Sequence, residues 1–318
     1  MPRALPRRRL YGLLNLLVLP SIGLICIGSN LVFAAQVGRE NPPDPLDYSL
    51  TSLSGSYAFV GTYGDHVAAN LGVVVFDGLG SAEGSILVNQ PGVNGSREIV
   101  NVTVDATYSV NPNGTGTIEF VVTFPDGHTA EVTEDFVITV SERRGRTLLA
   151  TSIFEAQQQP SVVISGTVFV VHTLTRLPDD PARRGYSQAS LSGDYSVVGT
   201  YTGHVASVLG VMSFDGRGTF AGSAVANQPG PNGPRTIVNI TLAGTYSVNA
   251  DGTGTMSVTV TQPNGASSNV TEDFVITSAG LRNGILLATS IVDAQRQASV
   301  ILSAGDVFVS HTYSRRPD

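Results

Sequence analysis

Four kinds of side chain that could hold a ligand or move a proton occur in pairs 138 residues apart. The sharpest pair is Glu134 and Glu272, each of which lies between a Thr and an Asp-Phe dipeptide. Alternate residues share one face of a strand, so Glu134 shares its face with Val132 and Phe136. A carboxyl group buried there must be hydrogen-bonded, paired or protonated. We therefore expect a ligand-orienting or acid–base group with a raised pKa; the alternatives are a bulge that exposes the carboxylate, or backbone partners that satisfy it.

The histidine pair is His66 and His204, which open the second expected strand of each copy in phase with inward apolar residues. A histidine at the rim of a barrel could orient a ligand or shuttle a proton near neutral pH. It could equally cap a turn or pack under a loop. His172 and His311 come near the end of the last expected strand, and we interpret them as structural residues at the opposite rim.

Arginines and tyrosines complete the candidates. Arg97 and Arg235 end the longest loop of each copy, where a guanidinium could clamp a carboxylate or phosphate, although loop arginines are usually solvated. Two tyrosines in the first strand of each copy are expected to line or fill the interior: Tyr57, Tyr63, Tyr195 and Tyr201. No zinc, nucleophile-elbow or phosphate-loop motif accompanies them, so we expect no catalytic residue, no metal and no other cofactor.

The paired residues reflect a duplication, because residues 53–179 are repeated at 191–318 without a gap until nearly the end. This unit exceeds the roughly 20 to 50 residues of solenoid repeats, so a whole domain has been copied in tandem. The expected organisation is a signal at 1–35, a spacer at 36–48, a first domain at 49–177, a linker at 178–186 and a second domain at 187–318.

Within each copy, apolar and polar residues alternate between Asp-Gly and Asn-Gly turn signals, the pattern of half-buried strands in hairpins. Eight strands are expected in the first copy, near 55–63, 66–76, 81–89, 98–110, 115–124, 129–140, 147–156 and 161–175. Eight strands joined by short turns fit a closed barrel without exposed edges. The predicted fold is all-β, a tandem duplication of an eight-stranded antiparallel up-and-down β-barrel, with a β-sandwich as the alternative. Connections near 64–66, 89–97, 125–128 and 157–160 share one rim, which we take as the mouth.

The first 35 residues are predicted to be an export signal, because four arginines precede an apolar run. Val32 and Ala34 then offer small residues at the −3 and −1 positions of a cleavage site. An uncleaved membrane anchor is the alternative. The single cysteine, Cys26, lies in this segment, and the absence of lysine excludes Schiff-base chemistry. A net charge of −7 without a basic face argues against a nucleic-acid partner. We expect a periplasmic, envelope or secreted protein with no membrane contact after cleavage.

Three repeated runs carry a resemblance to known proteins. They are Gly-Val-x-x-Phe-Asp-Gly-x-Gly at 72–80 and 210–218, Thr-Tyr-Ser-Val-Asn-x-x-Gly-Thr-Gly-Thr at 107–117 and 245–255, and Asp-Phe-Val-Ile at 135–138 and 273–276. With these runs the chain resembles small exported bacterial β-barrel proteins of unknown function, similar in outline to lipocalins and the allene oxide cyclase barrel. The resemblance covers nearly all of each repeat and implies the barrel fold. No catalytic residue of the cyclase is recognised, so its activity is not implied.

These features favour an exported, non-catalytic protein whose two barrels bind a small apolar or amphipathic ligand. One alternative is a structural or adhesive envelope protein with filled barrels. Another is a cofactor-independent isomerase or cyclase of lipid-like substrates that uses Glu134 and His66 as its acid–base pair. A single 16-stranded outer-membrane pore is disfavoured, because the outward positions are Thr, Asn and Ser and no Trp is present for interfacial girdles.

We predict that cleavage after about Ala34 removes the signal during export. N-terminal sequencing of the protein recovered from the exported fraction should therefore begin near Ala35. Recovery of the arginine-rich N-terminus in washed membranes would show an anchor instead.

Overall fold

The computed structural model describes residues 47–63, 69–91, 97–162, 169–179, 185–201, 207–229, 235–298 and 308–317 of the 318-residue chain. The expected signal at 1–35 and the histidines His66 and His204 lie outside these residues. No helix within the described part is long and apolar enough to cross a membrane.

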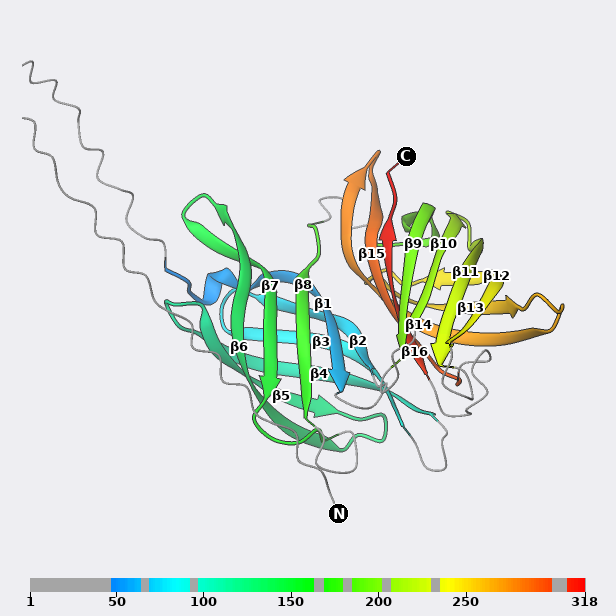
Figure 1. Ribbon diagram of the computed structural model, residues 1–318. Helices are drawn as coiled ribbons and strands as arrows, with labels where there is room; N and C mark the ends of the chain where they lie inside the picture. The colour runs from blue at the N-terminus through cyan, green and yellow to red at the C-terminus, as the bar shows by residue number, and fades with distance from the viewer. Residues whose placement is uncertain are drawn as a thin grey trace, which may run out of the picture. The chain divides into compact units, whose positions relative to one another are not determined.

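Barrel 1 is a closed antiparallel sheet in which each strand pairs with the next and β8 pairs back with β1 (Figure 1). A short 3-10 helix, η1 (Leu50–Ser52), precedes it. Its strands are β1 (Ser54–Tyr63), β2 (Ala69–Asp77), β3 (Ser81–Pro91), β4 (Arg97–Val110), β5 (Thr115–Thr123), β6 (Thr129–Arg144), β7 (Thr147–Gln157) and β8 (Val170–Arg176). The predicted strands correspond to the observed ones, but β6 runs to Arg144 rather than 140 and β8 begins at Val170 rather than 161, while the expected start of the second strand at 66–68 lies outside the described residues.

Barrel 2 repeats this arrangement, with β16 pairing back with β9. It follows η3 (Gln188–Ser190) and comprises β9 (Ser192–Tyr201), β10 (Ser207–Asp215), β11 (Thr219–Pro229), β12 (Arg235–Val248), β13 (Thr253–Thr261), β14 (Ser267–Arg282), β15 (Ile285–Gln295) and β16 (Val309–Arg315). The predicted tandem of two eight-stranded up-and-down barrels is confirmed. The sandwich and the single 16-stranded pore are wrong, because each copy closes its own sheet.

The Asp-Gly signals form the turns that they predict. The Asp77 carboxylate accepts hydrogen bonds from the backbone N–H groups of Leu79 at 2.7 Å and Ser81 at 2.9 Å, and Gly78 takes a φ of 75°. These hydrogen bonds, led by that of Ser81, lower the pKa of Asp77. The carboxylate thus holds the β2–β3 hairpin from inside the turn.

A layer of aromatic rings fills the interior of barrel 1 at the end opposite the predicted mouth. Tyr57 is fully buried, and its hydroxyl donates a 2.7 Å hydrogen bond to the carbonyl of Ala150. The ring of Phe76 meets both Tyr57 and Tyr108 edge-on, with centroids 5.2 Å apart in each case. The core-filling interpretation is therefore the right one for Tyr57.

Barrel 2 contains the same aromatic layer. Tyr195 donates a 2.7 Å hydrogen bond to the carbonyl of Ala288, and Phe214 lies 5.3 Å from Tyr195 and from Tyr246. Burial raises the pKa of Tyr195 to about 12. Tyr195 therefore also fills the core.

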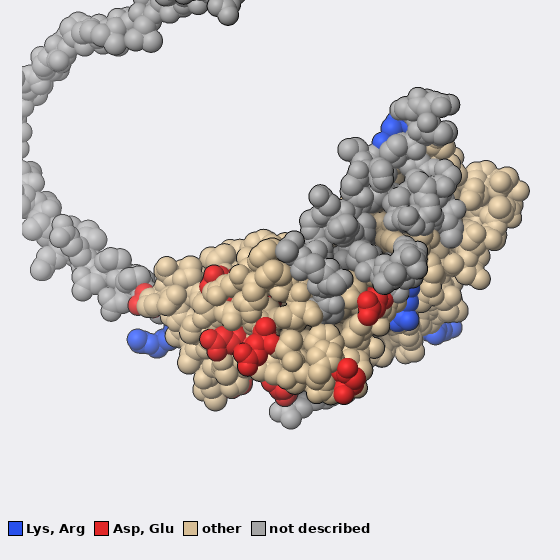
Figure 2. Space-filling view, turned by 90° about the horizontal axis from the view of Figure 1, so that it is seen from below, with Lys and Arg blue, Asp and Glu red and all other residues tan. Residues whose placement is uncertain are grey.

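The outer surface carries few charges, in keeping with a charged fraction of 14%. On the face shown in Figure 2, a few acidic and basic side chains of the described residues are scattered over a mostly uncharged surface. The ionisable groups of interest are inside the barrels.

We predict that Tyr57→Phe lowers the free energy of unfolding by about 1–2 kcal/mol, because the buried carbonyl of Ala150 loses its hydroxyl donor. Urea unfolding followed by circular dichroism measures the change. The matched variant Tyr195→Phe should cost a similar amount through Ala288. A change below a few tenths of a kcal/mol in both variants would contradict a stabilising role for these hydrogen bonds.

Candidate functional site

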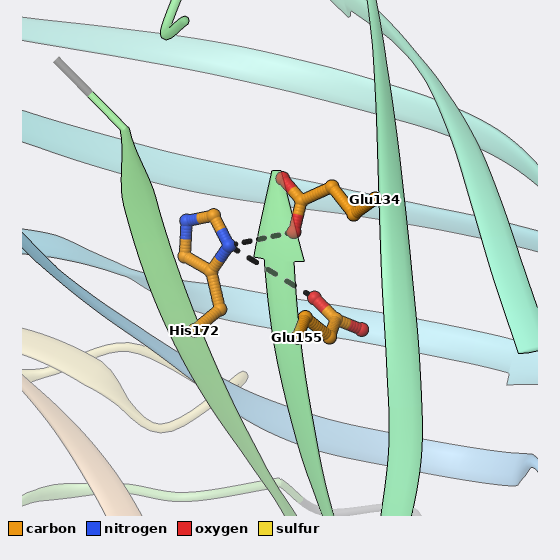
Figure 3. Close-up of side chains that lie close together, drawn as sticks. All are labelled: Glu134, Glu155 and His172. Carbon is orange, nitrogen blue, oxygen red and sulfur yellow. Dashed lines mark hydrogen bonds and ion pairs between the residues drawn. The ribbon is translucent and has the colours of Figure 1, made fainter. Parts of the chain in front are cut away.

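Three ionisable side chains converge inside barrel 1 from three consecutive strands (Figure 3). They are Glu134 of β6, Glu155 of β7 and His172 of β8, and one ligand atom of each lies within 4.8 Å of the others. The register of the paired strands brings them together. Glu155 lies directly opposite His172, and Glu134 lies opposite Gln157, two residues along β7 from Glu155. All three are at most 2% exposed. We call this set cluster 1.

His172 is the centre of cluster 1. Its Nδ1 lies 2.8 Å from Oε2 of Glu134 and 4.0 Å from Oε2 of Glu155. On the other side of the ring, Nε2 lies 3.2 Å from Nδ2 of Asn70 on β2. The Phe59 ring covers the imidazole, with centroids 4.3 Å apart. Both ring nitrogens therefore have polar neighbours, and the ring face has an apolar one.

Gly61 makes room for this imidazole. It lies directly opposite His172 where β8 pairs with β1. A Cβ atom at Gly61 would overlap Cδ2 of the ring. In barrel 2, Gly199 stands in the same relation to His311. A glycine is therefore required at both positions to let the histidine lie flat against the neighbouring strand.

Glu155 has an unusual environment. Its side chain is fully buried, and neither carboxyl oxygen has a hydrogen-bond partner among the described residues. Burial and the neighbouring Glu134 carboxyl raise the pKa of Glu155 well above its usual range. The charged form of Glu155 is therefore disfavoured where it lies. Such an unsatisfied group costs stability, and natural cores contain few of them.

Barrel 2 holds the equivalent cluster 2, formed by Glu272 of β14, Asp293 of β15 and His311 of β16. Nδ1 of His311 lies 2.9 Å from Oδ1 of Asp293 and 3.8 Å from Oε1 of Glu272. The hydroxyl of Tyr313 donates to Oδ2 of Asp293 at 2.7 Å, and Gln295 donates to Glu272 at 3.2 Å. Unlike cluster 1, cluster 2 supplies each of its carboxyl groups with a hydrogen-bond partner.

The titration of cluster 2 follows from these contacts. Burial and then the Asp293 carboxylate raise the pKa of Glu272 to about 8. Burial by itself would lower the pKa of His311, but Asp293 and Glu272 outweigh it and raise that pKa to about 9. At neutral pH, Glu272 is therefore protonated and His311 carries a positive charge beside Asp293.

A small cavity adjoins each cluster. Its volume is about 40 Å³ in barrel 1 and about 30 Å³ in barrel 2. A water molecule needs roughly 10–15 Å³ by this measure, whereas an engineered cavity that binds benzene measures about 150 Å³. With the walls as they are, each cavity accepts water, an ion or a molecule of a few atoms. Neither accepts a lipid.

The structure places the predicted residues unevenly. Glu134 and Glu272 point inward, as strand alternation predicts, while their ligand-binding role stays a prediction. Arg235 is exposed and donates hydrogen bonds to Asn227, at 2.8 Å to Oδ1 and 3.1 Å to the carbonyl oxygen, away from the cavity. Several candidates have side chains that lie outside the described residues: His66, His204, Arg97, Tyr63 and Tyr201.

The assignment of His172 and His311 to the opposite rim is wrong. Because β8 begins only at Val170, His172 is its third residue and pairs with Gly61 near the mouth end of β1. An expected strand that begins at 161 places the histidine towards its far end, whereas in the observed strand it lies near the start. Glu155 and Asp293 were missed altogether. Their signal was available, since each follows an isoleucine two residues earlier and precedes a glutamine two residues later on the same strand face.

Comparison with models of known protein families and with curated proteins finds no match to this chain. The function therefore has to be argued from the two barrel interiors.

We predict that the free energy of unfolding of barrel 2 falls as pH rises from about 5 to 9. Folded Glu272 keeps its proton up to about pH 8, whereas the unfolded side chain loses it near 4.5, so the folded state binds more protons in between. His311 also makes the free energy of unfolding fall as pH rises. Its raised pKa stabilises the fold fully below about pH 6.5, and that stabilisation is lost above about pH 9. Urea unfolding at pH 5, 7 and 9 measures the slope.

The variant Glu272→Gln isolates one contribution to that slope. It should remove the loss between pH 5 and 8, on the order of a few kcal/mol, while His311 continues to titrate. Exposed Glu119→Gln on β5 is the matched control and should keep the wild-type slope. An unchanged slope in Glu272→Gln would mean that Glu272 does not hold a proton in the folded barrel.

Proposed function

We propose that the protein is an exported, non-catalytic binding protein that holds one small ligand at the ionisable cluster of each barrel. One observation carries this proposal. The two interiors have diverged in their apolar walls, yet each keeps two carboxyl groups and a histidine at equivalent positions beside a cavity.

The divergence of the walls gives this retention its weight. Phe59, Asn70 and Phe120 line the cavity in barrel 1, and valines replace all three in barrel 2: Val197, Val208 and Val258. Over the same duplication Glu134 and His172 correspond to residues of the same type, Glu272 and His311, and Glu155 is replaced by Asp293. Buried ionisable groups are costly, so a structural core would lose them as readily as it changes its aromatic residues. Their retention favours a use for them.

The geometry also limits the ligand. The cavity in barrel 1 is lined by Glu134 and His172 together with apolar side chains such as Val104 and Val132. A ligand of a few non-hydrogen atoms with one polar group fits both surfaces. The small volumes disfavour an isomerase or cyclase acting on lipid-like substrates. Export to the periplasm, the envelope or the medium remains a proposal that rests on the sequence.

A structural protein with filled barrels is the second candidate, and the aromatic layers favour it. Rings occupy the closed end of each interior, and only about 30–40 Å³ remains beside the clusters. Under this alternative the clusters bind nothing and titrate as isolated core groups.

We predict that the protein, purified from its own host under native conditions, retains a bound species that native mass spectrometry detects as added mass. Removing the carboxyl groups in a Glu134→Gln, Glu272→Gln double variant should lower the affinity by about 1–3 kcal/mol and reduce the retained species accordingly. Exposed Glu119→Gln should retain as much as the wild type. A wild-type protein without added mass would favour filled structural barrels.

A further inference from the structure

We propose that cluster 1 binds one divalent transition-metal ion through Glu134, Glu155 and His172, whereas cluster 2 is closed to metal by Tyr313. This inference rests on the proposed function, because it names the ligand class of the site in barrel 1.

The donor set matches such an ion. One imidazole nitrogen and two carboxylate oxygens are ligands that divalent first-row metals accept, and zinc binds both types at about 2.0–2.2 Å. The three donor atoms already lie within 4.8 Å of one another. Rotation of the long Glu134 and Glu155 side chains is enough to bring their oxygens onto one ion, since β6, β7 and β8 hold the three Cα positions in register.

Glu155 is the second, independent observation that points to a ligand. It is fully buried, its two oxygens have no hydrogen-bond partner among the described residues, and its carboxyl group is directed at His172 and Glu134 (Figure 3). A divalent cation would provide the missing partner. It would also balance the two negative charges of the ionised carboxylates, so that the occupied site is neutral in an apolar interior.

The surroundings of His172 suit a metal ligand. Metal-bound histidines usually donate their other ring N–H to an oxygen, which fixes the orientation of the ring. With Nδ1 on the ion, Nε2 carries the proton, and the neighbouring Asn70 amide can accept it through its oxygen after a rotation about its terminal bond. The cavity of about 40 Å³ leaves space for water to complete the coordination.

Cluster 2 also has two carboxyl groups and a histidine, but each of its carboxyl groups accepts a hydrogen bond from a further side chain. Tyr313 donates to Asp293, and Gln295 donates to Glu272. In barrel 1 the position of Tyr313 is occupied by Leu174, which has no hydroxyl to donate. The exchange of leucine for tyrosine therefore separates an open cluster from a closed one.

The inference is tested by titrating purified protein, stripped with EDTA and dialysed, with zinc chloride in a calorimeter. We expect one zinc ion per chain. Glu155→Gln and His172→Ala should weaken binding by at least about tenfold. His128→Ala at an exposed hairpin should leave the affinity unchanged. Circular dichroism of each variant shows whether it is folded.

The exchange of Leu174 and Tyr313 gives a matched pair of variants that retain all the proposed ligands. Leu174→Tyr should reduce zinc binding by barrel 1, and Tyr313→Leu should add a second site. Wild-type protein that binds no zinc, or a Leu174→Tyr variant that is folded and binds as the wild type does, would overturn the inference. If zinc fails to bind but native mass spectrometry shows a retained organic molecule, only the metal inference fails; if neither is found, the proposed function fails with it.

Discussion

The pairing of the last strand with the first is the contact on which each barrel interior depends. In barrel 1, β8 pairs with β1 from Tyr57 opposite Arg176 to Tyr63 opposite Val170. This pairing closes the sheet and satisfies the backbone groups that an open edge would expose. It also sets His172 against Gly61 of β1. The two acids reach His172 through the pairing of β6, β7 and β8, whereas closure brings Phe59 and Asn70 against its ring.

The interior is divided along its axis into two parts with different physical roles. At the end opposite the mouth, Phe76 packs edge-on against Tyr57 and Tyr108, and the two tyrosine hydroxyl groups donate to backbone carbonyls, which compensates their burial. At the other end, Glu134, Glu155 and His172 are buried at a cost that hydrogen bonding only partly offsets. The first part therefore stabilises the barrel, and the second reduces that stability in exchange for a polar group inside an apolar wall.

The duplication provides an internal comparison that a single barrel could not. The two clusters have the same charge types, but in cluster 2 the Tyr313 hydroxyl donates to Asp293, whereas cluster 1 has a leucine in place of that tyrosine and Glu155 accepts no hydrogen bond from the described residues. Once a copy exists, one site can become satisfied by its own side chains while the other remains open. The two barrels thus share a fold and differ in how far their ionisable groups are available to a ligand.

The sequence alone determined the tandem repeat, the all-β class, eight strands per copy and the inward direction of Glu134 and Glu272. These features are local, because alternation with a period of two and Asp-Gly turn chemistry act between near neighbours in the chain. Only the tertiary structure decided which groups meet. The partners of Glu134 come from β7 and β8, and their contact depends on the register in which β6, β7 and β8 pair. It also decided how much space remains, since cavity volume is the small difference between the barrel and all the side chains that fill it, and no local pattern records that difference.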